Sequence, residues 1–179
     1  MSLATKITLP FLALFALLLL VLGMVLARSI LGEVESRVER EQRFVLEVAT
    51  FPGFVLGEET LRQIRDKVAS QPGDTPAARA EFVVFQESAV ALSTFSSGDA
   101  HAAPTVADLE KAVKSGQLAA GDEFIHRDTR KLGGRNWLIL YTQRAARSGS
   151  ASPRRLYLLY PYEEIERAKN QALLRILGL

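Results

Sequence analysis

The sequence contains no cysteine among its 179 residues, which excludes disulfides, thiolate chemistry, and zinc or iron–sulfur sites held by cysteine. It has only two histidines, His101 and His126, and their wide separation argues against a His-rich metal site. It also lacks a glycine-rich phosphate loop ending in Lys-Ser/Thr, a nucleophile elbow and a His-Glu-x-x-His motif. We therefore expect neither a cofactor nor enzyme activity in this segment.

Charge is missing from one long stretch near the N-terminus. Ile7–Ala27 holds 21 residues without Asp, Glu, Lys or Arg, and as a helix it spans roughly 31 Å, the thickness of a bilayer core. It is longer than the apolar core of a signal peptide, but Val25-Leu26-Ala27 offers a cleavage site, so anchor and cleaved signal both stay open. We favour an anchor in the inner (cell) membrane. The arginines after the segment, Arg28, Arg37, Arg40 and Arg43, would by simple counting keep that side in the cytoplasm, but the positive-inside rule weakens for long translocated domains. We therefore expect residues 1–6 to be cytoplasmic and the main domain to be extracytoplasmic.

After this segment the pattern is helical as far as Thr50. Five apolar residues recur at a spacing of three or four, and Glu41 occupies the position where a further apolar residue would be expected. No Gly or Pro interrupts Glu33–Thr50. The charges between them, including Glu35 and Glu39, are expected to form an exposed face. A stiff helix over 28–50 is therefore predicted. Its narrow seam either packs on its own domain alone or also pairs with a second copy in a parallel homodimer. The seam consists of Leu31, Val34, Val38, Val45 and Val48.

The chain then alternates between helical and strand patterns. A second helix is predicted over Glu58–Ser70, with Leu61, Ile64, Arg65 and Val68 at helical spacing. A third opens at Thr105, which can cap it with Asp108 three residues on, and a fourth begins at Tyr162. Strands are predicted at 82–85, 90–95, 123–131, 135–144 and 154–160, with Gly133-Gly134 as a tight hairpin turn. This order predicts an α+β fold, a five-stranded antiparallel sheet with helices on one face.

The sequence turns apolar again over its last eight residues, 172–179. Residues 166–179 are expected to form an exit helix. This helix either docks into the core or leads toward a second membrane helix, truncated at residue 179. In the second case two membrane helices hold the domain over 28–165, an arrangement that carries information across a membrane.

This order of elements resembles the extracytoplasmic PAS-like, or single Cache, sensor domains of bacterial sensor histidine kinases. The local sequences that carry the resemblance are Lys6–Phe11, Glu41–Leu46 and Leu159–Ile165. The resemblance covers nearly the whole chain and implies the input domain of a two-component receptor. The kinase core of such receptors follows the second membrane helix and is absent here. A membrane-anchored structural or interaction protein, with a dimerising helix and no ligand, is the alternative.

Positive charge is concentrated in the last three strands. Residues 28–126 carry a net charge of −6 and residues 127–162 a net charge of +7. Arginine is favoured where a planar carboxylate or phosphate is held, and the resemblance places small ligands against this half of the sheet. A pocket for a small anionic metabolite is therefore implied, although charge balance within the fold or contact with anionic lipid headgroups would produce the same cluster. Nucleic acid is not expected as a partner of an exported domain. The candidate ligand-binding residues are Arg127, Arg135, Arg154, Tyr141 and Tyr157.

Overall fold

The computed structural model describes residues 3–50, 57–69, 80–86, 89–96, 98–118, 124–144 and 154–177. Its helices are α1 (Leu3–Thr50), α2 (Glu58–Ala69), α3 (Ala102–Lys114) and α4 (Tyr162–Leu177). Its strands are β1 (Glu81–Gln86), β2 (Ala89–Ser93), β3 (His126–Leu132), β4 (Arg135–Arg144) and β5 (Arg154–Pro161). The predicted α+β class is confirmed. Glu123, at the start of the predicted third strand, and the ends of the chain at residues 1–2 and 178–179 lie outside the described residues.

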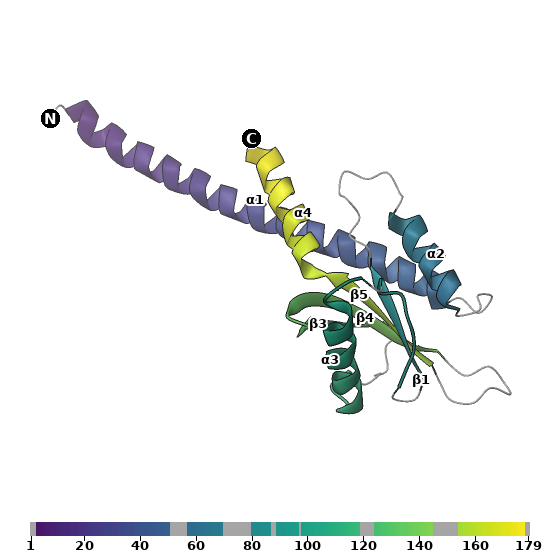
Figure 1. Ribbon diagram of the computed structural model, residues 1–179. Coiled ribbons are helices and arrows are strands. Elements are labelled where there is room, and N and C mark those ends of the chain that lie inside the picture. The colour runs from purple at the N-terminus through teal and green to yellow at the C-terminus, as the bar shows by residue number, and fades with distance from the viewer. Residues whose placement is uncertain are drawn as a thin grey trace.

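Helix α1 joins the predicted anchor and the predicted stiff helix into one element of 48 residues. Its large apolar side chains from Phe11 to Leu26 are all exposed. Among the described residues it is the single helix long and apolar enough to cross a membrane. Figure 1 shows this part of α1 projecting away from the rest of the fold.

The five strands form one antiparallel sheet in the order β2-β1-β5-β4-β3. The hairpin between β3 and β4 turns at Gly133 and Gly134, as predicted, with φ angles of 56° and 84°. Glycine suits both positions because left-handed backbone carries no steric cost for it. The strand order leaves β2 and β3 as the two edges, each hydrogen-bonded to one neighbour within the sheet.

The prediction of helices on one face of the sheet is wrong, because helices cover both faces. On one face, Leu46 of α1, Leu61 of α2 and Ile165 of α4 pack against alternate residues of the central strands. On the other face, Leu109 and Val113 of α3 pack against the remaining residues of the same strands. Figure 1 shows α3 on the opposite side of the sheet from α1, α2 and α4. The central strands are thus buried on both sides, as their continuous apolar runs require.

Helix α3 begins three residues earlier than predicted, so Thr105 is not its cap. Pro104 fits within the first turn, where a missing N–H costs nothing, and the Thr105 N–H donates to the His101 carbonyl. Asp108 does not form a capping box either; its carboxylate accepts the Gly133 N–H at 2.8 Å. A Cβ on Gly133 would lie 2.8 Å from the Thr105 nitrogen, so glycine allows the hairpin to approach α3 this closely.

Candidate functional site

The two terminal helices meet on one face of the sheet. Helix α4 continues directly from β5, and Ile165 in its first turn is fully buried in the core that α1 helps to form. Figure 1 shows α4 running from the sheet across α1, toward the side on which the apolar half of α1 projects. Residues more than a hundred positions apart therefore lie together at this crossing.

A charged junction joins α1, α4 and the edge strand β3 at this crossing. Glu35 of α1 accepts a hydrogen bond on Oε1 from Arg127 of β3 at 2.7 Å and one on Oε2 from Lys169 of α4 at 2.5 Å. The Arg127 Nε also pairs with Glu39, one turn further along α1, at 3.0 Å. These four residues, Glu35, Glu39, Arg127 and Lys169, are called the α1–α4 junction below.

Each side chain of the junction is partly shielded from water. The Glu35 side chain is 26% exposed and that of Lys169 19%, whereas Arg127 retains 41%. The hydrogen bond from Lys169 is the largest influence on Glu35, and together with the charges of Lys169 and Arg127 it lowers the pKa of this carboxyl despite its partial burial. Burial is the largest single influence on Lys169 and acts to lower its pKa, but the hydrogen bond and charge of Glu35, together with Tyr162, outweigh it and the pKa is raised. Both groups are thus held in their charged forms.

Tyr162 contacts the junction, and Tyr160 is influenced by other charged residues of the same two helices. The ammonium of Lys169 lies 5.7 Å from the centre of the Tyr162 ring, within cation–π range. Burial, followed by the negative charges of Glu164 and Glu41, raises the pKa of Tyr160 to about 12. Tyr160 therefore stays neutral between a carboxylate of α4 and one of α1.

The sequence placed Glu35 and Glu39 on an exposed face of the helix, and this was wrong. The two partners of Glu35 lie 92 and 134 residues away along the chain, so no local sequence pattern reveals them.

The structure also shows where the residues of the predicted seam lie. Val45 is buried in the sheet's own core and Val38 packs against it, so this part of the seam packs on its own domain, and pairing with a second copy stays a prediction. Leu31, Val34 and Val48 are half-buried.

The five candidate ligand-binding residues do not gather at one place. Tyr141 and Tyr157 stack at 5.3 Å within the core on the α3 side, while Arg127 lies at the junction with α1 on the other side. Arg135 lies 3.8 Å from Glu163 at the start of α4, and Arg154 is exposed at the beginning of β5. Two of the three arginines thus balance carboxylates of the same chain.

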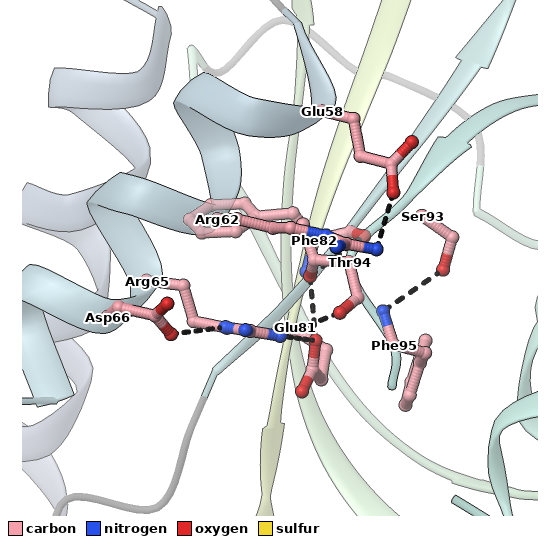
Figure 2. A network of polar contacts seen from close by, with 9 residues as sticks. All are labelled: Glu58, Arg62, Arg65, Asp66, Glu81, Phe82, Ser93, Thr94 and Phe95. Carbon is pink, nitrogen blue, oxygen red and sulfur yellow. Dashed lines mark hydrogen bonds and ion pairs between the residues drawn. The ribbon is translucent and has the colours of Figure 1, made fainter. Parts of the chain in front are cut away.

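A second charged network lies on α2, β1 and the residue that follows β2, and its central residues Arg65, Glu81 and Thr94 are buried (Figure 2). Arg65 of α2 pairs with Glu81 at 3.3 Å and donates to the Thr94 carbonyl at 2.7 Å, while its Nε reaches Asp66 at 2.9 Å. The Thr94 hydroxyl donates to Glu81 at 2.7 Å. Arg65 already stood out in the sequence, because it occupies a core position of a helix whose neighbouring positions are apolar.

Burial dominates the electrostatics of this network. It raises the pKa of Glu81 even though Thr94 and Arg65 both stabilise the carboxylate. For Arg65, burial acts to lower the pKa, but Asp66 and Glu81 outweigh it and the pKa rises. The network fastens α2 to the sheet with a charged pair that has little access to water.

Among the described residues, no group of three or more His, Asp and Glu side chains is arranged to hold a metal ion. Comparison with models of known protein families gave no match, and comparison with curated proteins gave none. The resemblance to PAS-like sensor domains therefore rests on the residues and the order of elements, and function has to be argued from the geometry.

Proposed function

We propose that this chain is the membrane-anchored extracytoplasmic sensor domain of a two-component receptor, a histidine kinase whose catalytic core lies elsewhere. The observation that carries the proposal is the α1–α4 junction. The apolar helix and the exit helix cross on one face of the sheet, joined by Glu35 and Lys169. A displacement of the sheet can therefore be transmitted toward the membrane through both α1 and α4.

Transmission needs two conformations of the helix pair that a cue distinguishes. A ligand shifts such an equilibrium only by its difference in affinity for the two states. The apolar core under α1 and α4 is well packed, and packed interfaces change between discrete arrangements rather than deform continuously. The domain itself needs no catalytic group for this role.

The cue we propose is a small anion or a physical change at the membrane. Arg154 is exposed and offers a guanidinium to a carboxylate, whereas Arg127 and Arg135 would have to exchange Glu35 or Glu163 for the ligand. A thermal-shift screen of organic acids on the full chain in detergent tests this. Arg154→Ala should weaken binding of an active acid roughly 10- to 150-fold, since a charged hydrogen bond contributes about 1.5–3 kcal/mol. If the variant binds the acid like the parent, Arg154 is not part of the site.

The side of the membrane can be tested directly because the chain has no native cysteine. A single cysteine at Lys114, exposed on α3, should react in intact cells with a thiol reagent that cannot cross the inner membrane. A cysteine placed at Ser2 should react only after the cells are opened. The reverse pattern would contradict the extracytoplasmic placement.

Signalling is tested in a chimera. Residues 1–177 replace the sensor domain of a well-understood receptor, joined to its second membrane helix and kinase core. Cysteines at Glu35 and Lys169, whose side chains meet, allow the two helices to be linked by a short bis-methanethiosulfonate reagent. We expect the crosslink to fix the kinase output at one level and reductant to restore it. An output that ignores both the crosslink and every anion tested would contradict a sensor role.

A homodimer is part of the proposal, and it is also part of the alternative, a membrane-anchored interaction protein. One exposed aromatic residue of α1 is a candidate for the dimer contact. Phe44 is 65% exposed on the outer side of α1, away from the sheet. Cysteine at Phe44 should form disulfide-linked dimers in membranes more readily than cysteine at Arg43, which lies about 100° further round the helix. Equal crosslinking at both positions would mean that α1 has no specific dimer face.

A further inference from the structure

The carboxylate of Glu35 bonds to two different elements, strand β3 and helix α4, one through each oxygen. One oxygen accepts from the sheet edge and the other from the exit helix. We propose that the α1–α4 junction is a coupler, in which Arg127 on β3 orients Glu35 so that Glu35 holds Lys169 and with it α4. This inference rests on the proposed function, and it names the contact through which the sheet regulates the helix pair.

The chemistry of the two cations makes the coupling directional. Arg127 spans two carboxylates one turn apart on α1, with NH2 on Glu35 and Nε on Glu39. A planar guanidinium that makes two bonds in fixed directions cannot slide along the helix without losing both. Lys169 is a point charge on a flexible chain and makes one bond to Glu35. Arg127 therefore sets the position of the carboxylate, and Lys169 follows it.

The position of Arg127 in the sheet makes it suited to sense displacement. It lies on β3, which pairs within the sheet with β4 alone, so β3 can shift or twist while the four other strands keep their ladders. Its side chain is also the most exposed of the four in the junction, so an external anion can reach it. A shift of this edge strand moves Arg127, and through Glu35 it changes the hold on α4.

Lys169 lies at a position on α4 where loss of its bond to Glu35 would affect the rest of the helix. Lys169 is in the second turn of α4, whereas Ile165 in the first turn is fixed in the core. Beyond Lys169 the helix becomes more exposed, with Gln171 and Leu174 in solvent. Release of Lys169 therefore frees the membrane-directed part of α4 while its base stays packed.

The test measures the distance between α1 and α4 by pulsed electron resonance in the full chain in nanodiscs. Spin labels are placed on cysteines at Ser29 and Gln171, both exposed, and the absence of native cysteine makes the pair unique. Lys169→Gln should broaden and shift the distance distribution because it removes the direct tie. Arg127→Gln should do the same, because Arg127 pairs with Glu35 and Glu39 of α1 and acts on α4 as a positioning residue.

A matched control lies on the same strand. Arg130 is also a β3 arginine in ion-pair contact, but its partners are Asp128 and Gln117 rather than α1. Arg130→Gln should leave the α1–α4 distribution as in the parent. Arg127→Lys, which keeps the charge but cannot span Glu35 and Glu39 together, should give an intermediate width.

Three results would overturn the coupler. Arg127→Gln could match the parent while Lys169→Gln broadens the distribution, which would make the two ion pairs independent. Arg130→Gln could broaden it as much as Arg127→Gln, which would indicate general loosening of β3. A distribution unchanged in every variant would show that apolar packing alone holds α4. The measurement needs neither ligand nor kinase, so it can fail while the chimera responds, or succeed while the chimera is silent.

Discussion

The α1–α4 junction and the Arg65 network both tie a helix to the sheet with opposite charges, but they differ in their access to water. The side chains of Arg65 and Glu81 are 7% and 12% exposed, whereas those of the junction are 19–41% exposed. A buried charged pair is costly to break, because the partner left behind is an uncompensated charge in a poor solvent. A half-exposed pair is weak and easily exchanged for water or another ion. The fold therefore fastens α2 firmly and leaves α4 adjustable.

The first prediction is the largest and tests the firm attachment. Arg65→Met should destabilise the chain by about 3–5 kcal/mol, because Glu81 remains buried without its partner. Unfolding of the full chain by denaturant in detergent micelles can be followed through Trp137, the single tryptophan, which is buried. Arg62→Met on the same helix breaks the half-exposed pair with Glu58 and should cost about 0–1 kcal/mol. Equal losses would remove the distinction between buried and exposed pairs.

The second prediction asks whether apolar contacts rather than charges hold α1 on the sheet. Leu46 is fully buried in the core, and Leu46→Ala should cost about 2–5 kcal/mol. Phe44→Ala, two residues earlier on the exposed side, should change the free energy of unfolding by about 0.5 kcal/mol or less. A comparable loss in both variants would mean that Phe44 packs against something in the micelle, such as a second copy.

The third prediction concerns the adjustable attachment. Glu35→Gln should cost only about 1–2 kcal/mol, since each half-exposed ion pair contributes about 0.2–1 kcal/mol. About 1 M salt should reduce the difference between parent and variant, because exposed charges are screened within about 3 Å at that concentration. A loss as large as that of Arg65→Met would show that the junction is a structural lock rather than an adjustable tie.

The fourth prediction separates the two networks by pH and is the smallest effect. Glu35 has a pKa below its ordinary 4.5 in the folded chain, so the stability it contributes is present above pH 4.5 and lost as pH falls through the folded value. Glu81 has a raised pKa, so its protonated form favours folding, and this contribution is lost as pH rises through the folded value.

Unfolding measured from about pH 6 to about pH 3 should show the two signs. Glu35→Gln should flatten the loss of stability at acid pH, and Glu81→Gln should steepen it. If both variants change the profile in the same direction, burial does not distinguish the two carboxyls.

Much of the fold could be predicted because it depends on patterns among residues close together in the sequence. The uncharged Ile7–Ala27 stretch, the β-branched and aromatic strands and the Gly133-Gly134 turn each have one physical interpretation at short range. The double-sided burial of the sheet was missed although a signal was present. Leu156–Tyr160 is apolar without alternation, which is typical of a strand covered on both faces.

The junction could not be predicted, and the reason is distance along the chain. Glu35 looks like one of several charges on a helix, and nothing near it in sequence shows that Arg127 and Lys169 fold against it. The same limit affected the ligand-binding set. An excess of arginine on three strands was visible, but Glu35, Glu39 and Glu163, which balance two of those arginines, come from other elements.

The proposed sensor role requires that α4 return to the membrane surface beside α1, and fluorescence quenching in nanodiscs tests this requirement most directly. A fluorophore is attached to a single cysteine at Leu174 near the end of α4, at Ser29 on α1, or at Lys114 on α3. Nitroxide groups on the lipids quench fluorophores that lie near the bilayer. We predict strong quenching at Leu174, comparable to that at Ser29, and weak quenching at Lys114. Quenching at Leu174 no stronger than at Lys114 would place the end of α4 away from the membrane and contradict the account.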